Sequence, residues 1–232
     1  MNWSGGKDSA LALYKAQQKG ISIDALVTSV NISTDKVSMH GVRRNLLMEQ
    51  TSSIGLPLDT IELPEMPGME PYENAVRQKH RQMKTEGFTH AIFGDIFLED
   101  LRKYREELLA KDNLQCIFPI WRMDSREVLV EFIQAGFKAI VVCVNSQSLD
   151  KRFCGRLIDE SFMADLPLDI DPCGENGEYH SFVFDGPVFS KPISFTTGEI
   201  NFKEYAQPSK GDDSVTAPQR RTGFHFQDLI VK

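Results

Sequence analysis

The chain has 232 residues, enough for one large domain or two small ones. Hydrophobic residues make up 41% and charged residues 25%, an ordinary composition for a globular protein. Acidic residues outnumber basic ones by 33 to 26, and the formal charge is -7. This balance excludes the overall basic bias of a dedicated nucleic-acid-binding protein and leaves room only for a local basic groove.

Four cysteines are spread along the chain, and none of them forms a C-x-x-C pair. The spacing indicates neither a zinc knuckle nor a thioredoxin-like motif, so we expect reduced thiols. The sequence opens on a glycine-rich turn instead of a basic stretch before an apolar one, which predicts no signal peptide. No apolar run reaches the roughly 18 residues that a membrane helix needs. We therefore expect a soluble, cytoplasmic protein.

Helical and strand patterns alternate in the first half of the chain. The elements expected there, in order, are helix 7–19, strand 23–30, helix 40–54, strand 58–63, helix 71–86, strand 90–95, helix 98–112 and strand 115–120. Such alternation predicts a parallel sheet covered by helices on both faces. Functional residues are then expected at the carboxyl ends of the strands.

A second unit is predicted after Trp121. Its expected elements are a helix from the capping-box pattern of Asp124 and Glu127 to Ala135, a strand at 137–144, a helix near 152–165, antiparallel hairpins in 180–189 and 191–202, and a last strand at 223–231. Residues 207–223 are rich in Pro, Ser, Gly, Asp, Gln and Arg, a composition that predicts a mobile loop.

The segment SGGKDS, residues 4–9, stands directly before the first helix. Its two glycines let the backbone approach a ligand, and the helix start offers unpaired N–H groups and the positive end of the dipole. Together these features favour a phosphate group. Asp8 fits this interpretation if it helps to hold Mg²⁺ on that phosphate. The simpler alternative is a capped strand-to-helix turn. A Walker loop is excluded, because Asp8 follows the lysine.

SGGKDS resembles the PP-loop of the N-type ATP pyrophosphatases, in which the loop holds the pyrophosphate end of ATP during attack on the α-phosphate. Segments 39–58, 94–107 and 166–189 are similar to the diphthine–ammonia ligase family. The PP-loop alone identifies a superfamily, and GENGEYH at 174–180 together with it is much more specific. The resemblance covers nearly the whole chain. In that family a full strand precedes the loop. Only three residues precede it here, so either the start is truncated or the first strand is very short.

The resemblance implies an α/β fold with two domains. Residues 1–121 would form a HUP-like (Rossmann-like) parallel-sheet domain that carries the PP-loop, of the adenine nucleotide alpha hydrolase type. Residues 122–232 would form a smaller α+β substrate domain that carries GENGEYH. Exposed hairpin edges in this second domain are compatible with a homodimer.

The implied activity is an ATP-dependent amide ligase. A substrate carboxylate would be activated as an acyl-adenylate, with release of pyrophosphate, and ammonia from solution would then displace AMP. The acceptor is diphthine-modified elongation factor 2 if the source makes diphthamide, and another carboxylate otherwise. Two alternatives stay open. One is a PP-loop ATP pyrophosphatase acting on tRNA or on another small molecule, and the other is a non-catalytic adenine-nucleotide-binding protein.

The resemblance assigns phosphate and Mg²⁺ contacts to the PP-loop residues Ser4, Gly5, Gly6, Lys7, Asp8 and Ser9. Backbone groups of Thr28, Ser29 and Val30 would contact the adenine side of ATP. His40 lies in an MHG turn that is expected beside the nucleotide. The equal alternative for His40 is a helix cap.

Gly94 and Asp95 end a predicted strand that faces the same crevice. Asp95 is expected to coordinate Mg²⁺ or to contact the substrate, with a helix cap as the alternative. Arg102 and Arg105 are expected to stabilise phosphates or to bind the substrate. Ion pairs with neighbouring glutamates are the alternative, and we expect this outcome for at least one of the two arginines.

The second predicted site is the acidic turn made of Gly174, Glu175, Asn176, Gly177, Glu178 and His180. Carboxylates between glycines suit a cationic substrate or ammonia. Glu175 or Glu178 could also take the proton from the attacking ammonium as a general base. The alternative is a turn that opens a hairpin. Cys173 is expected to be a packed thiol, because the chain shows no partner cysteine for nucleophilic chemistry.

Overall fold

A computed structural model describes residues 1–37, 40–206 and 221–232 of the chain. In its first half the elements are α1 (Lys7–Gln18), β1 (Leu26–Asn31), β2 (Lys36–Val37), α2 (Arg44–Ile54), β3 (Leu58–Leu63), α3 (Met69–Thr85), β4 (His90–Ile92), α4 (Glu99–Ala110) and β5 (Gln115–Ile117). The predicted alternation of helices and strands is confirmed. Gly55 ends α2 in the left-handed conformation, with φ of 80°, which glycine adopts without steric cost.

Residues 1–3 lie between two pairs of parallel strands and bond to both, with an isolated bridge between Asn2 and Val27. β1 pairs in parallel with β3 on one side, and β4 pairs in parallel with β5. Residues 1–3 join these two pairs, because the amide of Trp3 donates to Val27 O at 2.8 Å and the amide of Asn2 donates to Ile92 O at 2.9 Å. The strands therefore lie in the order β3, β1, residues 1–3, β4, β5, and the PP-loop leaves the middle of the sheet.

The second half contains α5 (Ser125–Gln134), β6 (Lys138–Asn145), η1 (Lys151–Phe153), α6 (Glu160–Asp165), β7 (Tyr179–Asp185), β8 (Phe195–Ala206) and β9 (Arg221–Val231). The four strands form an antiparallel sheet in the order β7-β6-β9-β8. The predicted capping residue is confirmed, since the Asp124 carboxylate accepts hydrogen bonds from two amides of the first turn of α5.

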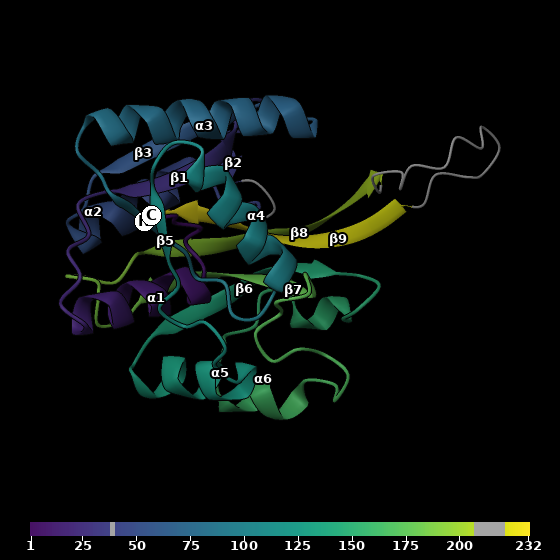
Figure 1. Cartoon of the computed structure of the whole chain (residues 1–232). Helices are drawn as coiled ribbons and strands as arrows, with labels where there is room; N and C mark the ends of the chain where they lie inside the picture. The colour runs from purple at the N-terminus through teal and green to yellow at the C-terminus, as the bar shows by residue number, and fades with distance from the viewer. Residues whose placement is uncertain (38–39, 207–220) are drawn as a thin grey trace.

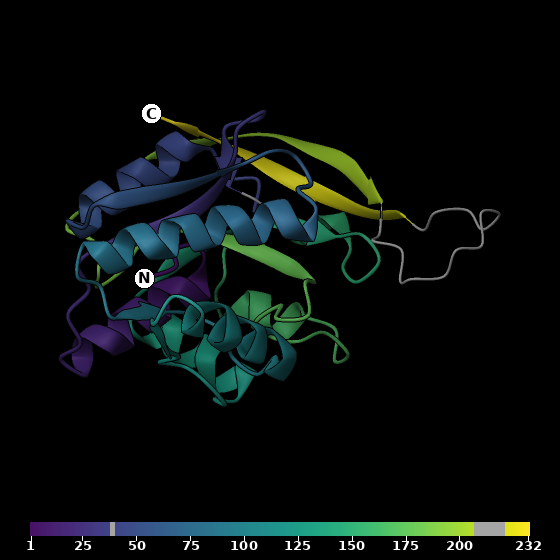
Figure 2. The same ribbon diagram turned by 45° about the horizontal axis from the view of Figure 1, so that its top comes forward.

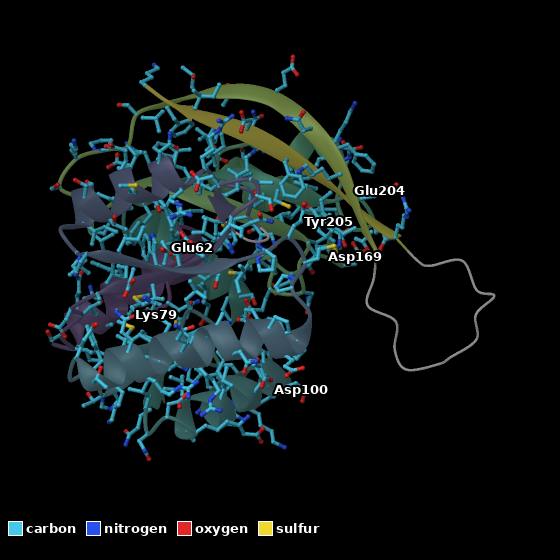
Figure 3. All side chains as sticks on the ribbon, turned by 90° about the horizontal axis from the view of Figure 1, so that it is seen from above. Glu62, Lys79, Asp100, Asp169, Glu204 and Tyr205 are labelled. Atoms are coloured by element: carbon cyan, nitrogen blue, oxygen red, sulfur yellow. The ribbon has the colours of Figure 1, made fainter. Side chains whose placement is uncertain are left out.

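Two predictions for this half were wrong in detail. A single helix near 152–165 does not form, because Gly155 takes a φ of 84° and its amide donates to Val141 O of β6 at 2.8 Å. The predicted hairpins also differ: β7 pairs with β6, and the long hairpin is β8–β9. This hairpin projects from the body of the molecule, and Glu204 and Tyr205 lie near its far end (Figures 1 to 3). Most of the predicted mobile loop, 207–220, lies outside the described residues.

One buried cluster extends across both halves of the chain. It includes Trp3 and Leu11 from the first half and Phe132, Val141 and Phe182 from the second. Figure 1 shows α3 along one side of the molecule and α5 and α6 along the opposite side. The division into domains at residue 121 stays a prediction. Among the described residues, no helix combines the length and apolar character needed to cross a membrane.

Candidate active site

The PP-loop is a tight turn in which the backbone conformation demands glycine. Gly5 has a φ of 77°. The Gly6 amide donates to Ser4 Oγ at 3.2 Å, and Ser9 Oγ donates to the Gly6 carbonyl at 2.8 Å. A Cβ on Gly94, just after β4, would lie 2.8 Å from the Asp8 carbonyl, so this glycine lets the strand end approach the loop. The predicted proximity of the loop and Gly94 is confirmed.

Gln50 of α2 fixes the loop from within the core. Its side-chain Nε2 donates to Gly5 O at 3.0 Å and to Val183 O at 2.5 Å, and its Oε1 accepts from Trp3 Nε1 at 3.0 Å. The residue is fully buried. Our sequence reasoning missed Gln50. The available signal was a glutamine three and four residues after Leu47 and Leu46, on the buried face of the helix.

Strand β7 of the second half contacts the loop directly. The Val183 amide donates to Gly5 O at 2.9 Å, and the Lys7 amide donates to Ser181 Oγ at 3.1 Å. The loop is therefore held between α2 and β7, and its shape depends on residues that lie more than half the chain away from it. Neither Ser181 nor Val183 was among the predicted site residues.

The side chain of Lys7 is buried among groups of the acidic turn, and only 4% of it is exposed. Its Nζ donates to Asp8 Oδ2 at 2.9 Å and to the carbonyl of Cys173, and it lies 5.0 Å from the centre of the Tyr179 ring. Burial opposes the charge, but Asp8, Tyr179 and Cys173 outweigh it and raise the pKa of Lys7. Lys7 therefore remains an ammonium, and the two predicted sites are in direct contact.

One carboxylate oxygen of Asp8 accepts a hydrogen bond from Lys7, and the other has no hydrogen-bond partner in the described part of the chain. Burial raises the pKa of this carboxyl, while the Lys7 ammonium opposes the shift. Asp8 is ionised in this pair, because the buried ammonium of Lys7 at 2.9 Å needs a carboxylate partner. Asp8 Oδ1 is buried and has no hydrogen-bond partner among the described residues. It is the oxygen that the loop could offer to a cation.

The turn that carries GENGEYH is stabilised by its own side chains. Asp171 Oδ1 accepts from the amides of Cys173 and Glu175, each at 3.0 Å. Gly174 has a φ of 68°, and a Cβ there would lie 2.8 Å from Tyr179 O. Tyr179 Oη donates to Pro172 O at 2.6 Å. These hydrogen bonds fix the shape of the turn. Gly174 cannot carry a side chain there, because Tyr179 lies too close and the φ is positive.

The two glutamates of this motif differ in their surroundings. Glu178 is buried and holds the turn, since its Oε1 accepts from the Asp171 amide at 3.3 Å and from Asn176 Nδ2 at 3.1 Å. Glu175 Oε1 accepts from the Ile96 amide at 2.9 Å, which ties the motif to the chain after β4. Burial raises the pKa of Glu175 to about 7, with a further upward contribution from Asp8, although the bond from Ile96 opposes the shift. Glu175 can therefore exchange a proton near neutral pH.

His40 and His180 form a stacked pair beside the loop. Their ring centres are 4.6 Å apart with an angle of 29° between the planes, and His40 Nδ1 lies 3.4 Å from Ser181 O. Burial lowers the pKa of His40 to about 4, and burial together with His40 lowers that of His180 well below its usual value. Both rings are neutral at physiological pH. The helix-cap alternative for His40 is wrong, because the N-cap of α2 is Arg43.

The predicted arginines are engaged with protein groups. Arg105 pairs with both oxygens of Asp95, with distances of 2.6 Å and 3.1 Å. Arg102 pairs with Glu106 at 2.7 Å and stacks on aromatic rings. The expected ion pair of at least one arginine is confirmed. Asp95 is not a helix cap, since Leu98 is the N-cap of α4. The roles of these side chains toward phosphate, metal or substrate stay predictions.

One of the three adenine-side residues, Ser29, lines a cavity. Thr28 is buried and its hydroxyl donates to Trp3 O, and Val30 is fully buried. Ser29 lines a cavity of about 80 Å³ between the parallel sheet and helices α3 and α4. Lys79 of α3 lines the same cavity and is labelled in Figure 3.

The four cysteines form no disulfide with one another. All four are free thiols, as the sequence predicted. Cys173 is buried, its Sγ donates to Ser125 O at 3.1 Å, and burial raises the pKa of its thiol. The prediction of a packed thiol is confirmed. Within the described ranges, no cluster of three or more His, Cys, Asp or Glu side chains is suited to hold a metal ion.

Family models match both halves of the chain. Residues 1–115 match the diphthamide synthase N-terminal domain and residues 124–209 match the diphthamide synthase C-terminal domain. The chain belongs to the diphthamide synthase family. The PP-loop lies in the first domain of the family and the acidic turn in the second, so the Lys7 contact joins the two.

Curated relatives with this family's chemistry align over most of the chain. A protein of Danio rerio named diphthine–ammonia ligase is 28% identical over 211 residues, covering 82% of this chain and 83% of that protein. A protein of Rattus norvegicus with the same name is 27% identical over 258 residues, covering 98% of this chain and 91% of that protein. These matches support an ATP-dependent amide ligase.

Proposed function

We propose that this protein adenylates a substrate carboxylate with ATP and then amidates it with ammonia. One observation carries the proposal: the side chain of the PP-loop lysine bonds to the carbonyl of Cys173, the residue directly before the acidic turn. A nucleotide bound by the loop and an amine bound by the turn would therefore be neighbours. Such a site suits a reaction in which the amine displaces AMP, because catalysis by positioning requires both reactants side by side.

The proposed reaction has two balanced steps. In the first, a carboxylate oxygen attacks the α-phosphorus of ATP, and pyrophosphate leaves with the electron pair of the broken P–O bond. In the second, ammonia attacks the carbonyl carbon of the acyl-adenylate, and the C–O bond breaks so that AMP leaves with its electron pair. The attacking nitrogen loses one proton. That proton passes to solvent, and Glu175, with a pKa of about 7, is suited to take the earlier proton that ammonium loses before it attacks.

The PP-loop would bind the phosphates, with Lys7 supplying positive charge and neutral His40 lining the approach. The loop offers an unpartnered carboxylate oxygen to Mg²⁺. This ion commonly binds through one or two carboxylates together with substrate phosphate oxygens, and Asp8 Oδ1 is a buried carboxylate oxygen without a partner. Asp95 could serve as a second ligand only by giving up a contact with Arg105. When bound, the metal would neutralise charge on the departing pyrophosphate.

The acceptor in this proposal is the diphthine side chain of elongation factor 2. The names of the relatives support it, since they are diphthine–ammonia ligases. The acidic turn also offers carboxylates to a cationic substrate, in keeping with the trimethylammonium group of diphthine. The cytoplasmic location and the homodimer stay predictions. β8 supports the dimer as an edge strand of its sheet.

The test supplies ATP, Mg²⁺, ammonium chloride and elongation factor 2 that carries diphthine. We expect AMP and pyrophosphate in equal amounts, together with conversion of the carboxylate to a carboxamide, measured by mass spectrometry. Unmodified elongation factor is the acceptor control. Lys7→Ala should abolish turnover, while Lys19→Ala, at an exposed position after the same helix, should not. Formation of ADP and phosphate, or equal AMP formation with transfer RNA as acceptor, would refute the proposal.

A further inference from the structure

Three chemically different groups surround the ammonium of Lys7, and we call them the ammonium cage. They are the carboxylate of Asp8 at 2.9 Å, the carbonyl of Cys173 and the face of the Tyr179 ring, whose centre is 5.0 Å away. A carboxylate and a carbonyl accept hydrogen bonds from an ammonium, and an aromatic face attracts its charge. This set of groups recognises any small ammonium ion, not only one attached to a lysine.

The Cys173 carbonyl and the Tyr179 ring are held in place by hydrogen bonds that do not involve Lys7. The carbonyl of Cys173 is aimed by the turn, in which Asp171 Oδ1 accepts from the amides on either side of Gly174. The Tyr179 ring is fixed by its hydroxyl bond to Pro172 O at 2.6 Å and by close packing on Gly174. Two of the three walls therefore keep their places if the lysine side chain leaves.

Lys7 cannot fill the cage and contact a phosphate with the same hydrogen-bond donors. Its side chain is only 4% exposed, and two of its three donors are taken by Asp8 and Cys173. One donor is left over, so Lys7 can engage the phosphates with more than one hydrogen bond only by turning out of the cage. The buried Cys173 carbonyl and the partly exposed Asp8 Oδ2 would then lose this donor, which is unfavourable above all for the carbonyl. A free ammonium ion would restore both bonds.

We propose that the ammonium cage is the binding site of the ammonia substrate, taken up as an ammonium ion after Lys7 turns toward the phosphates. This inference rests on the ligase function proposed above and adds the place and order of ammonia binding. The lysine acts as a stand-in for the substrate cation, so the nucleotide must bind first. The acidic turn would then help to bind ammonium as well as the acceptor.

The proton balance of this site follows from its neighbours. Ammonium must lose one proton to expose the lone pair that attacks the acyl carbon. Glu175 lies in the same turn, two residues after Cys173, and interacts electrostatically with both Asp8 and Lys7. It receives the proton from the bound ammonium. A second proton leaves the nitrogen as the amide forms and AMP departs, and it passes to solvent.

Kinetics of Tyr179 variants test the cage. Tyr179→Leu removes the aromatic face, and we expect the KM for ammonium to rise about tenfold, as for loss of a desolvated cation–π contact. The KM for ATP should not rise, because the same change weakens the contact that Lys7 gives up when it turns toward the phosphates. Tyr179→Phe keeps the face and should retain a KM for ammonium within about threefold of wild type.

Phe182→Leu on the same strand is the matched control, since Phe182 is fully buried and its ring packs against Phe195. It should leave the KM for ammonium unchanged. If Tyr179→Leu shows a normal KM for ammonium, or if Phe182→Leu raises that KM equally, the cage is not the ammonium site.

Binding to the wild-type protein tests the order and needs no variant. ¹⁵N-labelled ammonium is added with and without α,β-methylene-ATP, and bound ammonium is detected by NMR. We expect binding only with the nucleotide analogue. Equal binding in both samples, or none in either, would overturn the exchange with Lys7. If the protein forms no AMP with any acceptor, the ligase function fails, and this binding experiment still decides the cage independently.

Discussion

Replacing Gln50 with methionine tests whether a buried amide holds the PP-loop in shape. Methionine has a similar length and flexibility but no hydrogen-bond donors. The change leaves Trp3 Nε1 and Val183 O without partners, while Gly5 O keeps its bond from the Val183 amide. Each buried polar group left unpaired costs about 1–3 kcal/mol, so we expect a loss of about 2–6 kcal/mol in the free energy of unfolding. That is a large share of the ~5–15 kcal/mol of a typical domain.

Urea unfolding followed by tryptophan fluorescence measures this loss, and linear extrapolation gives the free energy of unfolding in water. Gln17→Met is the matched control, because Gln17 is exposed near the end of α1, and it should change stability by less than about 0.5 kcal/mol. We also expect a higher KM for ATP in Gln50→Met, since Gly5 loses one of its two anchors. Equal stability and equal KM in the two variants would show that the amide network does not position the loop.

Three further outcomes follow from the structure. Glu175 has its pKa raised to about 7 by burial, so amide formation should rise with pH through 7, and Glu175→Gln should remove that rise. Because ionisation is unfavourable in the fold, wild type should also lose stability relative to Glu175→Gln between pH 5 and pH 8, as measured by thermal unfolding. Gly94→Ala places a Cβ 2.8 Å from loop backbone and should cost about 1–3 kcal/mol while raising the KM for ATP. Gly68→Ala, with its nearest atom at 3.7 Å, should not. Asp112 is held by Arg77, whose hydrogen bonds lower its pKa, so the urea stability advantage of wild type over Asp112→Asn should disappear as pH falls below 4.

The sequence predicted the regular elements well where local signals decide them. The run of Ala and Leu after the loop, the β-branched strand that became β1 and the stop at Gly55 all depend on neighbours within a few residues. The helix predicted near 152–165 was wrong, because tertiary pairing overrode the helical pattern of this segment. Gly155 turns there so that its amide can reach β6, and a glycine inside a helical pattern does not reveal such a partner.

The site was predictable in its parts but not in its connections. The motifs located both the loop and the acidic turn, and the position of His40 beside the loop was expected. The partners of Lys7 and the roles of Gln50 and Ser181 were not, because these contacts join residues 45 to 174 positions apart. Local pattern indicates that Gln50 faces inward, yet nothing local says which carbonyls its amide will meet.

The anchoring of the loop by β7 has a consequence for attempts to dissect the protein. A fragment that ends before the second half would lack the Ser181 hydroxyl, the Val183 amide and the Cys173 carbonyl that the loop contacts. Its nucleotide-binding turn would face water in place of these groups and would lose its fixed geometry. Swapping halves between relatives should therefore transmit changes in β7 directly to nucleotide affinity, even though no residue of that strand belongs to the loop.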